Sequence, residues 1–267
     1  MCGTCGCGNN NGPMITEVLD DNKHIHHHGN HHHHHHDHDH HDHHHHEGKT
    51  IIELEKDILH QNQLFAERNR GYFLAKNMVA LNLVSSPGSG KTSILEKTLE
   101  SINKEIPCYV IEGDQQTLHD AQRIRATNTP VMQVNTGQGC HLESDMVHKA
   151  MRQLAPESDS VLFIENVGNL VCPAMFDLGE TDRVVIMSVT EGDDKPIKYP
   201  DAFRHAGVCI INKTDLLPYV NFDVNQAKKY ALQVNPTLQF FELSATSGEG
   251  MDQWISWIKE QILVTQT

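Results

Sequence analysis

The 267-residue sequence contains no run of 18 or more apolar residues, and its first residues, MCGTCGCGNN, lack the apolar stretch of a secretion signal. We therefore expect no membrane-spanning helix and no secretory leader, and a cytoplasmic location is the default. Basic residues are also scarce, because 21 Lys and Arg stand against 35 Asp and Glu, for a formal charge of -14. Nucleic-acid binding needs a basic face, so this balance argues against a nucleic-acid partner.

Residues 1–48 have too few aliphatic and aromatic side chains to form a core, so we expect a disordered tail, followed by one domain at 49–267. Most of the 22 histidines lie in 24–46, where three aspartates interrupt them. The length of the run and these interruptions argue against an expression tag. A weak, high-capacity metal store is the better interpretation, and its affinity should fall below the histidine pKa of about 6.5.

The chain has seven cysteines, and Cys2, Cys5 and Cys7 crowd into its first seven residues. In a reducing compartment this spacing favours metal ligation over disulfides. Removal of Met1 would add an α-amino nitrogen to the three thiolates. Four such ligands can hold Zn²⁺ in a tetrahedron or Ni²⁺ in a square plane. The alternative is a reactive tail without a metal.

From residue 49 onward the sequence predicts an α/β domain. Apolar residues at steps of three and four predict a helix over 51–76. Short β-branched runs then alternate with amphipathic stretches, which indicates a mostly parallel sheet covered by helices on both faces. Strands are predicted at 79–84, 109–113, 131–135, 161–166, 184–189, 208–213 and 238–243, and helices at 91–105, 116–126, 141–154, 196–206, 223–234 and 250–263.

The first predicted strand runs into the loop SSPGSGKT at 85–92, and a predicted helix follows. In such a loop, backbone N–H groups and the helix N-terminus face phosphates, Lys91 neutralises them, and the Thr92 hydroxyl can hold Mg²⁺. The usual pattern has glycine where this chain has Ser85, but the strand–loop–helix context supports the assignment. The predicted phosphate-binding set is Gly88, Ser89, Gly90, Lys91, Thr92 and Ser93.

A second motif, Asn212-Lys213-Thr214-Asp215, follows a later strand. The Asp215 carboxylate can accept both N–H donors on one edge of guanine, whereas adenine presents the wrong arrangement. Asn212 would brace the loop, and the stem of Lys213 would cover the base. The backbone of Ser244-Ala245 could meet the guanine carbonyl, a weak signal that is useful only beside the other two.

Asp114 and Glu165 end two predicted strands, at the edge where open α/β sheets bind ligands. Either can bind Mg²⁺, directly or through water, or orient the attacking water, and either can instead merely cap its strand. We therefore assign Lys91, Asp114 and Glu165 to catalysis. Neither a catalytic glutamine nor an arginine finger is evident, so turnover should be slow without a partner.

A second metal site is suggested by Cys140, His141 and Cys172. Cys140 and His141 are expected to begin a helix, whose N-terminus favours the thiolate, and Cys172 lies seven residues after Glu165. Three such ligands suit Zn²⁺ or Ni²⁺, and a site shared across a symmetric dimer would supply the fourth. Spacing alone slightly favours two buried structural cysteines and a surface histidine. Cys108 and Cys209 lie in strands and are expected in the core.

The N-terminal cysteines, the histidine tract, SSPGSGKT, IEGD, GCHLE, ENVGNLVCP and NKTD occur in this order. The sequence therefore closely resembles the HypB family, the nickel-incorporation GTPases of hydrogenase maturation, over residues 77–267 and the extreme N-terminus. The resemblance implies a Rossmann-like P-loop GTPase that dimerises on GTP binding. It also implies that Cys140, His141 and Cys172 bind metal at the dimer interface, and that Cys2, Cys5 and Cys7 form the tighter nickel site.

The resemblance further implies two partners, a HypA-type zinc protein and the hydrogenase large subunit. We thus expect a GTP-driven nickel metallochaperone with GTP or GDP, Mg²⁺, Ni²⁺ and Zn²⁺ as ligands. GTP would order 165–173, and hydrolysis would release nickel. One alternative is the urease-assembly GTPase, disfavoured by the N-terminal cysteines and by Cys172. The other is a metal storage protein whose nucleotide domain is merely structural.

Overall fold

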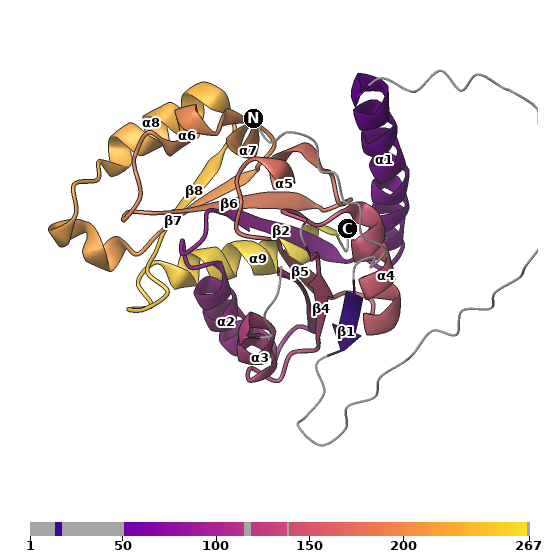
Figure 1. The fold of residues 1–267 in the computed structure, drawn as a ribbon. Coiled ribbons are helices and arrows are strands. Elements are labelled where there is room, and N and C mark those ends of the chain that lie inside the picture. Colours follow the sequence, from indigo (N-terminus) through magenta and orange to yellow (C-terminus); the bar gives the residue numbers. More distant parts are fainter. Residues whose placement is uncertain (1–13, 18–50, 115–118, 138, 266–267) are drawn as a thin grey trace, which may run out of the picture.

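The computed structural model describes residues 14–17, 51–114, 119–137 and 139–265. These residues form an eight-stranded sheet of order β1-β4-β3-β5-β2-β6-β7-β8 (Figure 1). β1 runs antiparallel to β4, and the other neighbours are parallel. The strands are β1 (Met14–Glu17), β2 (Val79–Ser85), β3 (Cys108–Asp114), β4 (Val131–Asn135), β5 (Val161–Glu165), β6 (Asp182–Ser188), β7 (Val208–Asn212) and β8 (Gln239–Glu242).

Helices cover both faces of the sheet, as the alternation of apolar runs and amphipathic stretches predicts. One face packs against α2 (Lys91–Ile102), α3 (His119–Arg125) and α9 (Met251–Thr265). The opposite face packs against α1 (Ile51–Ala75), α4 (Ser144–Leu154), α5 (Cys172–Met175), α7 (Pro200–Arg204) and α8 (Val224–Val234). The α/β fold class is therefore confirmed, and each strand predicted beyond residue 78 is present within one or two residues of its predicted ends.

Two sequence-based expectations need correction, and a third falls partly outside the described residues. Met14–Glu17, inside the tail expected to be disordered, forms β1, because its backbone pairs with the open edge of β4 and Ile15 packs on the core. The helix predicted at 196–206 is two short helices, α6 (Lys195–Lys198) and α7, because Pro200 starts a new helix after Tyr199. Residues 115–118, in the helix predicted at 116–126, lie outside the described residues.

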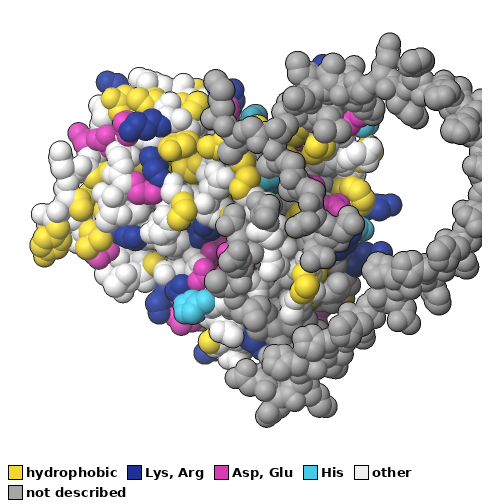
Figure 2. All heavy atoms as spheres, in the orientation of Figure 1, with side chains coloured by type: hydrophobic (Ala, Val, Ile, Leu, Met, Phe, Trp, Pro, Cys, Tyr) yellow, Lys and Arg dark blue, Asp and Glu magenta, His cyan; other side chains and the backbone are white. Residues whose placement is uncertain are grey.

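Cys108 and Cys209 are buried in the core, as expected for cysteines in strands. No helix in the described part of the chain is both long and apolar enough to cross a membrane. Where described residues are visible in Figure 2, acidic and basic side chains are intermixed, and no broad basic surface covers that side. The carboxyl ends of β2, β3, β5 and β7 meet at one edge of the sheet, where the predicted motifs gather.

Candidate nucleotide and metal site

The phosphate-binding loop joins the end of β2 to the start of α2. Gly88 and Gly90 have φ values of 74° and 98°, in the left-handed region that favours glycine. A Cβ atom on Gly90 would lie 2.4 Å from Nδ2 of Asn212, so this position needs glycine for space as well. Ser85 is buried, and its Oγ accepts a hydrogen bond of 3.0 Å from Nζ of Lys91. The departure from the usual glycine thus gives the lysine a partner that orients it.

Two distant motifs meet the phosphate-binding loop. Nδ2 of Asn212, at the end of β7, donates to the carbonyl oxygen of Ser89 at 2.8 Å. Oδ1 of the same asparagine accepts from the N–H of Ala245 at 3.2 Å. Nζ of Lys213 donates to the carbonyl oxygen of Gly88 at 2.8 Å. Asn212 therefore links the loop, its own motif and the Ser244-Ala245 segment into one unit.

The carboxylate of Asp215 lies in the 3₁₀ helix η1 (Thr214–Tyr219), directly after this junction. Its Oδ1 accepts a hydrogen bond of 2.5 Å from Oγ of Ser244. The hydroxyl holds the carboxylate beside the loop that carries Ala245. A carboxylate held in this way can accept the paired N–H donors of guanine.

A further clamp on the phosphate-binding loop was not identified from the sequence. Lys195 contacts both Oγ of Ser86 and the carboxylate of Glu191, and Oε1 of Glu191 accepts from Oγ of Ser89 at 3.3 Å. Both charged side chains are largely buried. Acid–base pairs four residues apart are common on helix surfaces, so spacing alone carried no signal that this pair faces the loop.

Two buried carboxylates stand at the start of α2. Oε1 of Glu165 accepts a hydrogen bond of 2.6 Å from Oγ1 of Thr92, and burial raises the pKa of Glu165. Glu112 lies beside it in register on β3. Burial and then the charge of Glu165 raise the pKa of Glu112 to about 9. Burial lowers the pKa of Lys91, and the charge of Glu165 opposes that shift.

These residues fit a magnesium ion. Oε2 of Glu112 and Oε2 of Glu165 are buried without a hydrogen-bond partner among the described residues. A buried polar atom without a partner is costly, and a cation offers one. Thr92, Asp114 and Glu165 supply the oxygen ligands that Mg²⁺ prefers. Sequence reasoning overlooked Glu112, although an acid inside an otherwise apolar strand was a usable signal.

The three internal metal-ligand candidates come together. Cys140, His141 and Cys172 each offer one ligand atom, and these atoms lie within 4.8 Å of one another. Sγ of Cys140 is 3.7 Å from Nδ1 of His141. All three residues are partly exposed, so the arrangement favours a metal site over two buried structural cysteines with a surface histidine.

The local structure around Cys140 corrects one expectation. α4 begins at Ser144, so Cys140 and His141 lie in the preceding loop and do not begin the helix. Thr136 and Gly139 are joined by hydrogen bonds of 2.8 Å and 2.9 Å that close a turn, and Leu142 then points into the core. Because of this turn, α4 starts at Ser144, and the expected position of Cys140 and His141 at its first residues is wrong.

His141 is prepared for metal binding by its surroundings. Its ring stacks on Phe176 with centroids 3.9 Å apart, and burial lowers its pKa to about 4. The imidazole is therefore neutral near neutral pH, which is the metal-binding form. Its Nε2 is buried without a hydrogen-bond partner among the described residues. The donor set of two sulfurs and one nitrogen suits Ni²⁺ or Zn²⁺.

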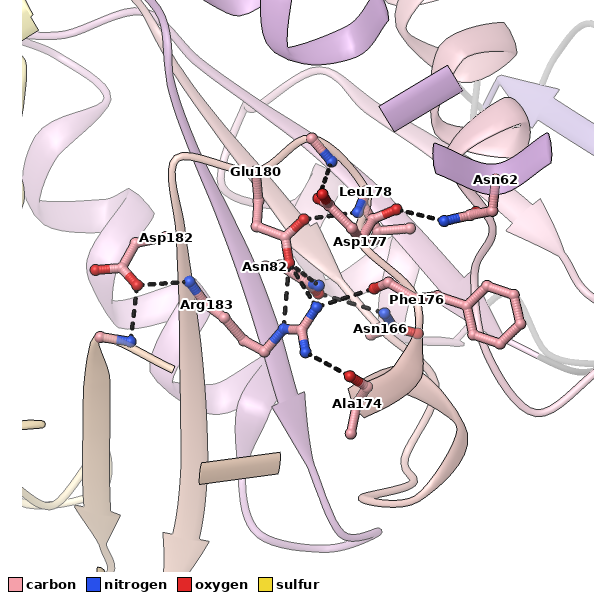
Figure 3. A network of polar contacts seen from close by, with 12 residues as sticks. Asn62, Asn82, Asn166, Ala174, Phe176, Asp177, Leu178, Glu180, Asp182 and Arg183 are labelled. Atoms are coloured by element: carbon pink, nitrogen blue, oxygen red, sulfur yellow. Dashed lines mark hydrogen bonds and ion pairs between the residues drawn. The ribbon is translucent and has the colours of Figure 1, made fainter. Parts of the chain in front are cut away.

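A buried polar network holds the segment that follows Cys172 (Figure 3). The guanidinium of Arg183 donates to the carbonyl oxygens of Ala174 and Phe176, each at 2.9 Å. It also forms a buried ion pair of 2.9 Å with Glu180, which accepts from Nδ2 of Asn82 at 3.0 Å. Phe176, the ring under His141, is thus fixed to the sheet through its own backbone.

The remaining predicted metal ligands, Cys2, Cys5, Cys7 and the histidines of 24–46, lie outside the described residues. Ser93 is described, and its Oγ accepts from Arg123 at 3.1 Å. This contact joins the start of α2 to α3, so the Ser93 hydroxyl packs between helices.

Comparison with known proteins places the site in a family. Residues 79–242 match the nucleotide-binding domain of the CobW/HypB/UreG family. The hydrogenase maturation factor HypB of Escherichia coli K12 is 55% identical over 213 residues, which cover 80% of this chain and 73% of that protein. The structure resembles HypB from Archaeoglobus fulgidus, with a TM-score of 0.72, 38% identity, and coverage of 76% of this chain and 100% of that one.

A second similar structure is HypB from Helicobacter pylori in complex with nickel, with a TM-score of 0.71 and 36% identity. It matches over 76% of this chain and 95% of that chain. The shared domain covers the phosphate-binding loop, the acidic strand ends and the Cys140–His141–Cys172 cluster. The chain belongs to the HypB family of hydrogenase maturation factors.

Proposed function

We propose that this chain is a GTP-hydrolysing nickel metallochaperone that stores nickel and delivers it for the maturation of nickel–iron hydrogenase. One observation carries the proposal: Cys172, which lies seven residues after Glu165 on one short segment, comes together with Cys140 and His141. The hydrogenase maturation factors among its relatives and the nickel complex of the Helicobacter pylori protein support the metal and the destination.

The chain's residues divide the binding of GTP between them. Asp215 reads the guanine edge, Lys91 and the backbone of the phosphate-binding loop hold the phosphates, and Asn212 keeps the two parts in register. Mg²⁺, held by Thr92, Asp114 and Glu165, would neutralise charge on the phosphates when bound. Ser85 holds the Lys91 ammonium in place before the nucleotide arrives.

Hydrolysis needs an oriented water more than covalent help from the protein. Asp114 and Glu165 both end strands at the phosphate side of the sheet. Glu165 is engaged by Thr92 and buried, whereas Asp114 is only half-buried, so Asp114 is the better placed of the two to reach a water.

Nickel is the cargo, held in this scheme by Cys140, His141 and Cys172. Three ligands per protomer leave a nickel ion open to another donor, and a GTP-dependent homodimer sharing the site would supply it. Val171 and Met175 flank Cys172 and are 56% and 59% exposed, which gives this segment an apolar rim that a second copy can cover.

The N-terminal residues extend the function. Cys2, Cys5 and Cys7 form the tighter nickel site in this proposal, and the histidines of 24–46 are a reserve. A HypA-type protein would accept nickel and pass it to the hydrogenase large subunit. The relatives are named as hydrogenase maturation factors, which favours a role in hydrogenase assembly over a role in urease assembly.

Substitution of Lys91 separates this function from pure metal storage. Lys91→Ala should abolish GTP hydrolysis and hydrogenase maturation and leave the nickel capacity of the full chain unchanged. Hydrogenase activity and bound nickel per chain are the two measurements. Normal maturation in this variant would favour storage, with a nucleotide domain that is only structural.

A further inference from the structure

Asn166 is the first residue after β5, and only 2% of it is exposed. Its amide contacts three groups in the interior. Nδ2 donates to Oδ1 of Asn82 at 3.3 Å, and the two side chains lie together in Figure 3. Oδ1 accepts two hydrogen bonds, from the N–H of Leu142 at 3.1 Å and from the N–H of Val167 at 3.0 Å.

The two N–H groups that share this oxygen belong to the two segments that carry the cluster. Leu142 directly follows His141, and Val167 begins the stretch that leads to Cys172. One side-chain oxygen therefore ties both segments to a single point at the end of β5. A second tie lies closer to the cluster, where Nδ2 of Asn169 donates to the carbonyl oxygen of Cys140 at 3.4 Å.

The position of Leu142 affects that of His141, because tight packing prevents the Leu142 side chain from moving independently. Its side chain is fully buried and packs on the backbone of β3. A Cβ atom on Gly113 would lie 2.7–2.9 Å from three carbon atoms of this leucine. A shift of the Leu142 backbone is therefore carried into the neighbouring histidine and is not absorbed in loose packing.

The same asparagine is attached to the nucleotide side. Its backbone neighbour is Glu165, which holds the Thr92 hydroxyl at 2.6 Å. Two residues further on, Gly168 lies against the phosphate-binding loop, where an added Cβ would be 3.2 Å from Cα of Pro87. Nucleotide and Mg²⁺ would compete with the hydrogen bond between Thr92 and Glu165. The backbone that carries Asn166 lies between Glu165 and Gly168, so it would have to adjust when they bind.

We infer that Asn166 is a positioning residue, whose amide oxygen transmits the nucleotide state to the Cys140–His141 half of the metal cluster. The inference rests on the proposed function, in which GTP and nickel binding are coupled. Asn166 is not among the residues assigned to bind nucleotide or metal, and it acts through the Leu142 and Val167 backbone. Energetic coupling between two sites requires an element that both sites bias, and this oxygen bridges the two.

The test uses Ni²⁺ alone as probe and a chain that has serine in place of Cys2, Cys5 and Cys7 and lacks the histidine tract of 24–46, so that the other nickel sites of the proposal are removed. Nickel dissociation constants are measured with GDP and with a non-hydrolysable GTP analogue, both with Mg²⁺. In the parent chain the two constants should differ by about fivefold or more. Asn166→Ala should bring their ratio to within about twofold of one, whereas Asn166→Asp, which keeps an oxygen for both N–H groups, should preserve most of it.

Asn103→Ala, just after α2, is the control, because it removes a side-chain amide hydrogen bond, from Nδ2 to the carbonyl oxygen of Thr127 at 2.7 Å, and leaves every contact of Asn166 in place. It should lower stability and still keep the nickel ratio. A parent-like ratio in Asn166→Ala, or an equal loss in Asn103→Ala, would overturn the role of Asn166. A ratio of one in the parent chain would instead show that the nucleotide does not affect nickel affinity, and it would contradict the proposed function itself.

A measurement on the unsubstituted chain covers the case in which Asn166→Ala does not fold. The exchange rate of the Leu142 amide hydrogen is compared between the GDP and GTP-analogue states. Because this N–H is bonded to Asn166, its rate should change by about fivefold or more between the two states. Equal rates would contradict transmission through this contact.

Discussion

Glu112 and Glu165 lie side by side in register on β3 and β5, and each keeps one carboxylate oxygen without a hydrogen bond in the described part of the chain. Both side chains are buried. Two such carboxylates repel each other unless a cation or a proton stands between them. The pair therefore makes the stability of the magnesium-free protein depend on pH.

Glu112→Gln tests this pH dependence. The pKa of Glu112 is raised from 4.5 to about 9 in the folded protein, so its contribution to stability is present below 4.5 and is lost as the pH rises toward 9. In EDTA the glutamine variant should therefore be more stable than the parent, and its advantage should grow by up to about 3 kcal/mol between pH 6 and pH 8.5. Chemical unfolding at the two pH values measures this difference. The exposed Glu157→Gln is the control, and parallel curves for parent and Glu112→Gln would refute the expectation.

Gly90→Ala and Gly88→Ala form a matched pair for the phosphate-binding loop. Both glycines have positive φ, but only Gly90 has a side chain, that of Asn212, in the space a Cβ would occupy. Gly88→Ala should cost about 1 kcal/mol of stability from backbone strain alone. Gly90→Ala should cost about 2–4 kcal/mol, because the Asn212 brace must also move. Thermal unfolding without nucleotide measures both, and equal losses would show that the Asn212 contact is unimportant.

The thiols should differ sharply in reactivity toward an alkylating reagent. Burial raises the pKa of Cys108 to about 12 and also raises that of the fully buried Cys209. At pH 9 only about a thousandth of Cys108 is thiolate, so both core cysteines should react only on unfolding. Cys140 and Cys172 are partly exposed and should react before the two core cysteines.

Nickel should slow the alkylation of Cys140 and Cys172 together, because both contribute to one cluster. Peptide mapping after a short exposure to reagent, with and without Ni²⁺, measures each site separately. Protection of Cys140 without protection of Cys172 would mean that the ion does not bridge the two segments.

Deletion of 24–46 should lower the number of nickel ions bound per chain and leave GTP hydrolysis unchanged. The histidine tract is a reserve in this account, so hydrogenase maturation should also be normal when nickel is plentiful. Hydrogenase maturation by the deletion variant is compared with that by the parent chain, in plentiful and in restricted nickel. A deletion variant that fails to mature hydrogenase in excess nickel would show that the tract has a direct role in transfer.

Most of the fold and much of the site could be predicted from the sequence. Continuous β-branched runs identified the parallel strands, and the SSPGSGKT and NKTD motifs marked the residues that meet at the Ser89–Asn212 contact. Local patterns succeed here because strand ends of a parallel sheet converge on one edge. The pairing of Met14–Glu17 with β4 was not foreseen, because edge pairing depends on an open strand elsewhere in the fold.

The polar interior of the site was beyond sequence reasoning. Asn82 and Asn166 contact each other although they are far apart in the chain, and Arg183 binds the carbonyl oxygens of Ala174 and Phe176 across an irregular loop. No local pattern distinguishes these three residues from surface residues. The loop before α4 was also missed, since an amphipathic pattern reaching back to residue 141 hides the Thr136–Gly139 turn. Helix starts depend on such turns, which periodicity does not report.

The most direct test of the central claim is the nickel affinity of the Cys140–His141–Cys172 cluster in the two nucleotide states. The chain that lacks 24–46 and has Cys2, Cys5 and Cys7 replaced by serine is titrated with Ni²⁺ against a competing chelator, with GDP–Mg²⁺ and with a non-hydrolysable GTP analogue and Mg²⁺. Because one segment joins Glu165 to Cys172, the dissociation constants should differ by about fivefold or more. Identical constants, with identical rates of nickel release, would contradict the account.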